Sequence, residues 1–295
     1  MQNRISGLAP DETLKVLNTL RAFKRALDQK RVAKSAALRK KLNARLRRWH
    51  LEDREPRLAF LAGLVNKTAM YPYVIGKGQD LPTRYADVAS LDEVDFAALP
   101  DRFVIKPSNA SDCAGVMLFT GDKELFSGDC VPITSRSAYA REKLASVRDE
   151  CTGETRIIIE EFVQDCDPDY AIPRDFKVYT AGGKAHLIQV INRNGLKKNW
   201  SNSFYSRDWE FIDQEVQIAY LQGPQMERPE RLHNLIVAAE FIAADLQCFY
   251  RLDFYMAARG PVFGEFTSEP FGGTGFTPFG ERLMCDLMDT YPDAV

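Results

Sequence analysis

The pattern of apolar and polar positions changes character near residue 100. Before that point, apolar residues recur every three or four positions among cations, most clearly in residues 20–50, LRAFKRALDQKRVAKSAALRKKLNARLRRWH. This spacing predicts an amphipathic helix or a helical pair, with Asp11 as a candidate N-cap. RLAFLAGLVNKTAM predicts another short helix. The passage that follows, YPYVIGKGQDLPTRY, is rich in Gly and Pro and predicts a loop.

After residue 100, short apolar runs predict strands. These runs are FVIKP, GVMLFT and RIIIEEFV, and DFKVYTAGGKAHLIQVINR predicts a hairpin with Gly182 and Gly183 in its tight turn. SRSAYAREKLASVRDEC and RPERLHNLIVAAEFIAADL predict helices between the strands. Paired strands mixed with helices favour an α+β or α/β body over a helical bundle.

The segment RLDFYMAARGPVFGEFT, residues 251–267, predicts a second hairpin. A three-residue loop from Ala258 to Gly260, with Gly260 in the left-handed conformation, would set Asp253 opposite Glu265. Alternation along the two strands then predicts two faces. One face carries Arg251, Asp253, Tyr255, Phe263, Glu265 and Thr267, and the apolar face carries Leu252, Phe254, Met256, Val262, Gly264 and Phe266.

Two directly opposed carboxylates repel one another unless a positive charge lies between them. A hard divalent cation such as Mg²⁺ would supply that charge, accept oxygen ligands and bridge to phosphate. The alternative is a salt-bridge network of Arg251 on a solvated sheet face, and a four-residue loop would shift the register and separate the acids. If the pair binds a metal, we expect repulsion between Asp253 and Glu265 in the metal-free protein, so that removing one charge does not lower stability.

Two lysines stand where strands carry few charges. Lys106 closes the strand FVIK, and the small residues PSNASDCAG behind it include Ser108, Ser111 and Gly115. Such a segment can fold backbone N–H groups around a phosphate, although an ordinary turn is the alternative because no P-loop motif is present. Lys177 in DFKVY repeats the pattern on a second strand.

The strand IIIEEFV ends in Glu160 and Glu161. Backbone and carboxylate groups at this end could meet an adenine and a ribose. The alternative is a strand that runs out into solvent.

Composition limits the class of protein. Hydrophobic residues make up 45% and charged residues 27% of the 295 residues, which is typical of a globular chain. No apolar run approaches the roughly 18 to 20 residues that span a bilayer, and MQNRISGLAPDETL has no apolar signal region, so we expect a cytoplasmic protein. Six cysteines without a CxxC pair, and only three histidines, argue against disulfides and structural zinc.

The net charge of −2 is unevenly distributed. Residues 1–60 hold 16 Lys or Arg against 6 Asp or Glu, and the remainder holds 23 against 35. A basic helix of this kind can rest on an anionic membrane surface or approach nucleic acid, or it can be a solvated helix that packs one face on the body. No recognised nucleic-acid module is present, so no nucleic acid is expected as a partner.

The ordered set of these features resembles the ATP-grasp superfamily. The set is a Lys before a small-residue loop, a strand ending Glu-Glu-Phe-Val, a second strand Lys, then RLDFY and FGEFT. In detail the chain is similar to the TupA-like ATP-grasp proteins encoded with cell-surface polysaccharide genes, through LPDRFVIKPSNASD, FYSRDWEFI, RLDFYMAARGPVFGEFT and GFTPFGERL. This resemblance covers roughly residues 80–285. It implies an α+β, ATP-grasp fold in which two sheet-containing lobes clamp a nucleotide.

The resemblance also implies a domain organisation. Residues 1–55 would form a basic helical N-terminal region, and residues 56–295 an ATP-grasp catalytic region with its nucleotide cleft roughly within 100–285. We expect residues 1–50 to be helical, dispensable for nucleotide binding and in peripheral contact with an anionic membrane.

The resemblance assigns roles to the candidate residues. Lys106 and Lys177 would hold the phosphates of ATP together with the loop residues Ser108, Ser111 and Gly115. The adenine and ribose would meet Glu160, Glu161, Phe162 and Val163, with Asp167 or Asp165 binding the ribose. Mg²⁺ would be held by Asp253, Glu265 and Thr267, and Arg251 and Lys177 are the candidate catalytic residues. Thr267 stands where better-known ATP-grasp ligases have an Asn, so either one or two Mg²⁺ ions would bind.

The implied activity is an ATP- and Mg²⁺-dependent carboxylate-amine ligase that acts through an acyl phosphate. It would modify a surface polysaccharide or its precursor with an amino acid or peptide. The three histidines, His50, His186 and His233, form no recognisable dyad or triad, which agrees with chemistry that needs no protein nucleophile. The alternatives are a kinase that phosphorylates a glycan hydroxyl and a non-catalytic nucleotide- or glycan-binding protein.

One further segment is a candidate for binding the acceptor. NRNGLKKNWSNSFYSRDW is both basic and aromatic, and it could bind an anionic sugar or lipid-linked substrate through Arg193, Lys197, Lys198 and Trp200. The alternative is a solvated loop.

Overall fold

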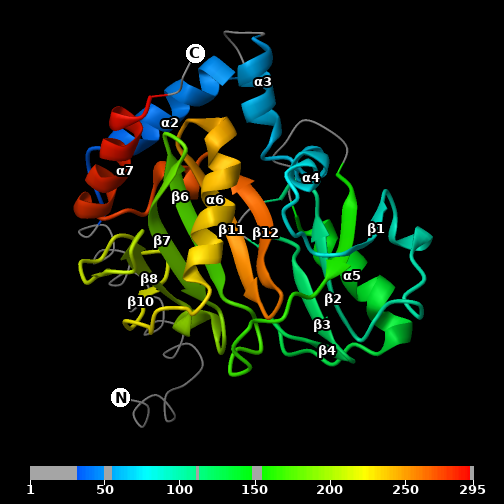
Figure 1. The fold of residues 1–295 in the computed structure, drawn as a ribbon. Coiled ribbons are helices and arrows are strands. Elements are labelled where there is room, and N and C mark those ends of the chain that lie inside the picture. Colours follow the sequence, from blue (N-terminus) through cyan, green and yellow to red (C-terminus); the bar gives the residue numbers. More distant parts are fainter. Residues whose placement is uncertain (1–31, 50–54, 111–112, 148–154, 293–295) are drawn as a thin grey trace, which may run out of the picture.

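A computed structural model describes residues 32–49, 55–110, 113–147 and 155–292 of the chain. Two mainly antiparallel sheets, each backed by helices, form a smaller and a larger lobe (Figure 1). The predicted α+β class with two sheet-containing lobes is therefore confirmed.

The smaller sheet has five strands in the order β1-β5-β2-β3-β4, and all of its pairs are antiparallel. Its strands are β1 Arg84–Val88, β2 Arg102–Pro107, β3 Met117–Thr120, β4 Lys123–Glu124 and β5 Ile157–Glu161. Helix α5 (Arg136–Ala145) covers one face, where Ala140 packs with Phe103 and Ile105. Because side chains alternate along β2, its next residues, Val104 and Lys106, point to the opposite face.

The larger sheet has the order β10-β8-β7-β6-β11-β12, with β9 paired to β8. Its strands are β6 Asp175–Ala181, β7 Lys184–Asn192, β8 Ser201–Ser206, β9 Phe211–Ile212, β10 Leu221–Gln222, β11 Tyr250–Ala257 and β12 Gly260–Thr267. The predicted β6–β7 hairpin is confirmed, and Gly182 and Gly183 in its turn have φ values of 56° and 75°. Such positive φ values at both positions suit a two-residue hairpin turn and favour glycine.

One face of the larger sheet packs on α6 (Leu232–Leu246), α3 (Pro56–Gly63) and α4 (Lys67–Gly76). The segment before residue 71 was predicted as one helix, but the structure divides it into α3 and α4. The Asn66 side chain begins a new helix, because it accepts hydrogen bonds from the N–H groups of Thr68 at 2.9 Å and Ala69 at 3.1 Å. Helix α4 then continues through Pro72 to Gly76, so the loop predicted from residue 71 begins later.

The other face of the larger sheet is partly covered by α2 (Ala37–Arg47) and α7 (Pro278–Thr290), which lie side by side (Figure 1). Leu38 and Leu42 of α2 are fully buried in one cluster with Tyr179 of β6 and Met284 of α7. At the start of α7 the Thr277 side chain accepts a hydrogen bond from the N–H of Gly280, and a proline follows Thr277.

Arg45 anchors α2 from within the molecule. Its side chain is buried and donates to the carbonyls of Phe249 at 2.8 Å and Ser268 at 3.0 Å, and its guanidinium lies 4.1 Å from the centre of the Trp49 ring. This part of the basic region is thus a helix with one face packed on the body. Residues 1–31 lie outside the described residues, and the predicted boundary at residue 55 stays a prediction.

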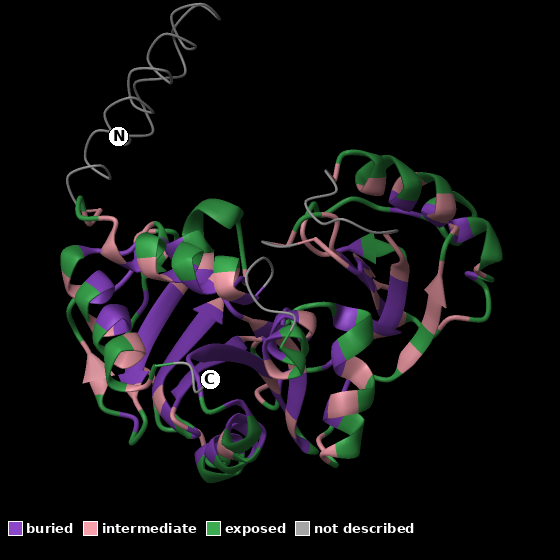
Figure 2. Cartoon of the chain, turned by 90° about the horizontal axis from the view of Figure 1, so that it is seen from above, coloured by how far each residue is buried: buried purple, intermediate pink, exposed green. Residues whose placement is uncertain are grey.

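The uncovered part of the larger sheet faces the smaller lobe. Asp175, Lys177 and Tyr179 lie on the same face of β6. Helices α2 and α7 cover this face at Tyr179. Figure 2 shows that the strands of the larger lobe are largely buried, whereas no residue of β1 in the smaller lobe is buried, and that the helices keep exposed faces. Within the described residues, no single helix is long and apolar enough to span a membrane, and only the bent pair α3 and α4 meets the length and composition test together.

Candidate active site

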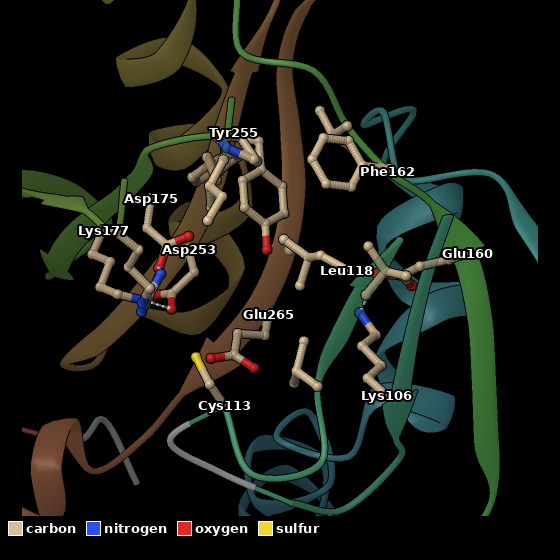
Figure 3. Close-up of a pocket in the computed structure, with 18 of the residues that line it drawn as sticks. Lys106, Cys113, Leu118, Glu160, Phe162, Asp175, Lys177, Asp253, Tyr255 and Glu265 are labelled. Carbon is tan, nitrogen blue, oxygen red and sulfur yellow. Dashed lines mark hydrogen bonds and ion pairs between the residues drawn. The ribbon is translucent and has the colours of Figure 1, made fainter. Parts of the chain in front are cut away.

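A cavity of about 150 Å³ lies between the two sheets. Both lobes contribute to its wall, which includes Lys106, Leu118, Glu160, Phe162, Asp175, Lys177, Asp253 and Glu265 (Figure 3). The charged residues of β6 and β11 lie on one side of the cavity, and the Lys106–Glu160 pair lies on the other. The structure thus brings most of the predicted site residues together.

The β11–β12 hairpin sets Asp253 opposite Glu265, as predicted. The route to this register is different, because Ala257 pairs with Gly260 and the turn has two residues rather than three. A bulge at Gly264 makes up the missing residue, since Asp253 pairs with Glu265 while the next residue, Phe254, pairs with Phe263. Gly260 has a positive φ of 126°, outside the left-handed helical region that the loop prediction required.

The bulge also changes which side chains share a face. Phe263 packs on the core side against Phe254, with their rings 5.2 Å apart and edge to face. Val262 instead joins the cluster that contacts Tyr255. The predicted faces were therefore wrong for Val262 and Phe263, because alternation reverses at the extra residue.

Arg251 and Lys177 bind Asp253 from both sides. Arg251 donates to the two carboxylate oxygens of Asp253 at 2.7 and 2.8 Å and to the hydroxyl of Thr267 at 2.9 Å. Lys177, directly opposite on β6, forms an ion pair with the same carboxylate. These three charged side chains are all buried, so the salt-bridge network of Arg251 exists but does not lie on a solvated face.

Glu265 is also surrounded by cations. Its carboxylate lies 3.6 Å from the Lys67 ammonium and 3.7 Å from the Arg251 guanidinium. Burial acts to raise its pKa, but Lys67, Lys177 and Arg251 outweigh this and lower the pKa of Glu265 to about 2. The expected repulsion between Asp253 and Glu265 is therefore wrong as a description of the metal-free site, because protein cations already neutralise both acids.

The two acids nevertheless fit a magnesium ion. Glu265 is ionised at neutral pH and its side chain remains 37% exposed, so one of its oxygens can reach a ligand. The described residues contain no cluster of three or more His, Cys, Asp or Glu that could hold a metal ion by itself. Mg²⁺ commonly takes one or two protein carboxylates and completes its shell with water and phosphate oxygens. The hydroxyl of Thr267 already accepts from Arg251.

Asp175 extends the charged cluster beyond the predicted residues. It lies two positions before Lys177 on the same face of β6, and its carboxylate is 3.4 Å from the Lys177 ammonium. It also accepts a hydrogen bond from Arg193. Burial raises its pKa, but Arg193 and Lys177 outweigh this, so the pKa of Asp175 is lowered. The i, i+2 spacing in the sequence Asp-Phe-Lys could have identified Asp175 from the strand pattern alone.

Lys67 is a second site residue that the sequence pattern did not reveal. It is the first residue of α4, and its ammonium donates to the carbonyl of Ala110 at 3.0 Å. Together with its contact to Glu265, this links the loop behind β2 to the larger sheet. Nothing in the segment around Lys67 predicts that its side chain reaches the other lobe.

The smaller lobe contributes the apolar part of the cavity. Leu118, Phe162 and Ile172 are buried together, and Val104 and Phe126 pack against them. Arg102 lies over the Phe162 ring at 4.5 Å. This end of the cavity suits a flat, largely apolar ligand group.

The acids at the end of β5 differ in their contacts. Glu160 forms an ion pair with Lys106. Glu161 accepts hydrogen bonds from the N–H of Thr83 at 3.0 Å and from Arg259 of the β11–β12 turn. Glu161, Phe162 and Val163 all line the cavity.

Several predicted binding residues lie away from the cavity wall. The hydroxyl of Ser108 accepts from the N–H of Arg156, and Gly115 packs against Val147 and Leu144. Asp165 is buried, and its carboxylate accepts hydrogen bonds from Arg174 and from the N–H of Asp167. Neither Asp165 nor Asp167 lines the cavity, and Ser111 lies outside the described residues.

Two further side chains line the cavity: Tyr255, which was predicted to share a strand face with Asp253, and Cys113, for which no site role was predicted. Tyr255 points its hydroxyl into the cavity between the two charged groups (Figure 3), and burial raises its pKa well above the ordinary value. Cys113, in the loop between β2 and β3, lies near Glu265, and burial raises the pKa of its thiol.

Comparison with known families decides the affiliation. The sequence model of the TupA-like ATP-grasp family matches residues 40–285. The chain belongs to this family. In this TupA-like ATP-grasp protein the match begins inside α2, closer to the N-terminus than the resemblance suggested. No curated protein sequence matches the chain.

Three of the solved structures with a similar arrangement are named as ligases. The D-alanine-D-alanine ligase from Helicobacter pylori is 15% identical, with a TM-score of 0.44, over 77% of this chain and 59% of its own. The D-alanine-D-alanine ligase from Bacillus anthracis is 14% identical, with a TM-score of 0.49, over 78% and 67%. The L-amino acid ligase from Bacillus licheniformis is 14% identical, with a TM-score of 0.44, over 73% and 43%. The TupA-like protein thus spans less than two thirds of the Helicobacter pylori enzyme's length.

Proposed function

We propose that the protein is an ATP- and Mg²⁺-dependent ligase that joins a carboxylate to an amine through an acyl phosphate. The observation that carries this proposal is the row of alternating charges on the larger sheet, Asp175, Lys177, Asp253, Arg251 and Glu265, at one side of a cavity whose other side is apolar. Membership of the ATP-grasp family supports ATP as the nucleotide.

The cavity accommodates the two ends of ATP in different ways. The adenine would lie in the apolar part beside Leu118 and Phe162, near the backbone that follows Glu161. The phosphates would lie between Lys106 of the smaller sheet and Lys177 of the larger sheet, because both residues line the cavity. Each lysine already contacts an acid, so ATP would compete with Glu160 and Asp253 for these cations.

The metal would be held by Asp253 and Glu265. When bound, Mg²⁺ would neutralise charge on the phosphate oxygens of ATP. Arg251 would then keep one hydrogen bond to Thr267 and could turn its remaining donors toward the transferred phosphate.

The reaction needs positioning and charge stabilisation more than a protein nucleophile. An oxygen of the substrate carboxylate attacks the γ-phosphorus, the bond from that phosphorus to the β–γ bridging oxygen breaks, and ADP leaves. The amine then attacks the acyl carbon, a C–N bond forms, inorganic phosphate leaves and the nitrogen loses a proton. Lys177 and Arg251 would stabilise the negative charge of the phosphoryl group as it moves.

Product analysis tests this proposal. The protein is incubated with ATP, Mg²⁺, carboxylates and amines, and ADP, free phosphate and the masses of the products are measured. A ligase releases free phosphate together with ADP and forms an amide. A kinase forms ADP while the phosphate remains on the acceptor, and a non-catalytic binding protein forms no ADP. The Asp253→Asn variant serves as the inactive control.

We also propose, from the resemblance to proteins of cell-surface polysaccharide genes, that the acceptor is a surface polysaccharide or its precursor. Peripheral contact of residues 1–50 with an anionic membrane is part of the same proposal, supported by the excess of cations in this region. Co-sedimentation with anionic vesicles tests it. The truncated chain should begin at residue 32, because deletion through residue 48 would remove the buried Leu38 and Leu42 of α2.

A further inference from the structure

Arg193 forms an ion pair with Asp175, the first residue of the charged row on the larger sheet, and has no role in the proposed chemistry. Arg193 directly follows β7, is only 7% exposed and lines the cavity. Tyr220, Phe126 and Phe271 line the cavity as well. This arginine comes from the basic and aromatic segment that the sequence marked as a candidate acceptor site.

Arg193 is held in one orientation. Its Nη1 donates to the carboxylate of Asp175, and its guanidinium lies 5.6 Å from the Trp200 ring centre and 5.9 Å from the Tyr220 ring centre. The Trp200 ring stacks on Tyr220 and contacts Phe126, so the aromatic side chains support one another. A guanidinium fixed by an acid and by aromatic faces is pre-organised for an additional planar acceptor.

The Nε of Arg193 is buried and has no hydrogen-bond partner among the described residues. A buried N–H donor without a partner is costly, and native structures usually satisfy such groups. Lys197 and Lys198 of the same segment are exposed instead, so Arg193 is the cation of this segment that can serve the cavity. The Nε atoms of Arg84, Arg102 and Arg136 are in the same state, so the position of Arg193 in the cavity wall, and not its Nε, is what points to a ligand.

We propose that Arg193 binds the carboxylate that the enzyme activates, with the aromatic side chains contacting the carbon skeleton of that substrate. This inference rests on the proposed function. A carboxylate matches the planar, two-pronged geometry of a guanidinium, whereas an amine would be repelled by it. Asp175 contacts both Arg193 and Lys177, so a carboxylate on Arg193 would lie one side chain away from the proposed phosphate site.

The test uses paired probes and a charge-matched control. The probes are D-glucuronate, L-glutamate and benzoate, each compared with its uncharged counterpart D-glucose, L-glutamine and benzamide. Binding is measured by thermal shift on the full chain with Mg²⁺ and a non-hydrolysable ATP analogue, and ATP affinity is measured by calorimetry. The variants are Arg193→Gln and Arg193→Lys, and the control is Arg228→Gln, which removes the same charge from an exposed arginine that does not line the cavity.

We expect at least one carboxylate, but not its uncharged counterpart, to stabilise the wild-type protein. Arg193→Gln should weaken that binding by about tenfold or more, as for loss of a hydrogen bond between charged groups, and change ATP affinity by less than about twofold. Arg228→Gln should match the wild type. Arg193→Lys keeps the charge without the planar fork, so its loss should be intermediate, and it decides the question if Arg193→Gln does not fold.

Other results would overturn the inference. If no carboxylate binds better than its uncharged counterpart, or if the Arg193 variants bind it as well as the wild type, Arg193 is not a carboxylate site. If Arg193→Gln loses ATP affinity as strongly as carboxylate affinity, Arg193 is a nucleotide ligand. If the wild-type protein fails to bind ATP, the proposed function itself is wrong, and this outcome is visible in the calorimetry before any variant is made.

Discussion

Each of the two sheets contributes a lysine to the same cavity, but the charged neighbours of the two lysines differ. Lys106 on the smaller sheet pairs with one acid, Glu160. Lys177 on the larger sheet contacts both Asp175 and Asp253, and each of these acids also binds an arginine. The smaller sheet therefore offers one ion pair beside an apolar surface, and the larger sheet offers a connected network of charges.

The difference follows from strand neighbours. Asp253 lies directly opposite Lys177 on the adjacent strand and directly opposite Glu265 on the other side, so three charged residues form one row across the larger sheet. On the smaller sheet, Lys106 lies opposite Ile158, and Val104 of the same face contributes to an apolar cluster with Leu118. We infer that the smaller lobe chiefly binds the nucleotide and that the larger lobe carries the chemistry.

The largest effect is expected from removing an acid of the larger sheet. Asp253→Asn or Glu265→Gln should lower turnover by about a hundredfold or more, since a proposed ligand of the Mg²⁺ that would neutralise phosphate charge is lost. Asp253→Asn should also destabilise the ligand-free protein by about 3 kcal/mol, because Arg251 and Lys177 would be left as buried cations with a weaker partner. ADP formation and thermal melting measure the two effects.

The control for these variants is Asp208→Asn, an exposed acid whose side chain is 80% accessible, which should change neither quantity. Melting of Asp253→Asn at the wild-type temperature would contradict the view that cations already balance this acid.

The two lysines should differ in stability rather than in nucleotide affinity. Lys106→Met and Lys177→Met should each weaken ATP binding by about 1.5 to 3 kcal/mol, the range for hydrogen bonds to charged groups. Lys106→Met should lower the melting temperature more, because buried Glu160 loses its ion pair with Lys106, whereas Asp175 and Asp253 each keep an arginine when Lys177 is replaced. Calorimetry and melting curves check this, with the exposed Lys184→Met as control. Equal melting temperatures for the two variants would remove the proposed asymmetry between the sheets.

A smaller effect is expected in the apolar part of the cavity. Leu118→Ala should weaken ATP binding by about 1 to 2 kcal/mol, since the adenine would lose apolar contact area, while turnover at saturating ATP stays within about twofold. The matched control is Ile133→Ala, an exposed apolar residue of the same lobe. Unchanged ATP affinity with a reduced turnover rate would reverse the roles assigned to the two lobes.

The smallest effect concerns pH. Because the folded-state pKa of Glu265 is lowered to about 2, its ionised form stabilises the fold fully above its unfolded-state pKa. That contribution is lost as the pH falls from about 4.5 toward 2. Solvent screens the exposed part of the carboxylate, so we expect the free energy of unfolding to fall by about 1 kcal/mol over this range. Chemical denaturation between pH 2 and 6 should show a shallower pH dependence for Glu265→Gln than for the wild type, and identical slopes would exclude this contribution.

The strands and most of the site could be predicted because local patterns specify them. The hairpin at Gly182 follows from alternation and turn residues. The pairing of Asp253 with Glu265 was predicted from a three-residue loop, but the structure reaches it through a two-residue turn and a bulge at Gly264. Two features could not be predicted from local patterns. The break at Asn66 divides a continuous apolar segment. Lys67 reaches the cavity only because α4 packs where it does, and long-range packing leaves no local signal.

The residues predicted to bind the phosphates and the ribose show the same limit of local sequence patterns. Ser108, Gly115 and Asp165 are polar or small residues at turns, as a binding loop requires, yet each is engaged in local packing or hydrogen bonding. A sequence pattern identifies a residue that can bind a ligand or stabilise a turn, and only its neighbours in space decide between the two.

The bulge at Gly264 means that the spacing of twelve residues between Asp253 and Glu265 is compatible with two different hairpins. In the second hairpin, Gly260 joins the turn, Gly264 pairs within the strand without a bulge, and the two acids remain paired. Val262 and Phe263 would then exchange faces, so a chain that made this change would also need these two residues in the opposite order. Any redesign of this hairpin should therefore change the length of the turn and the order of Val262 and Phe263 together.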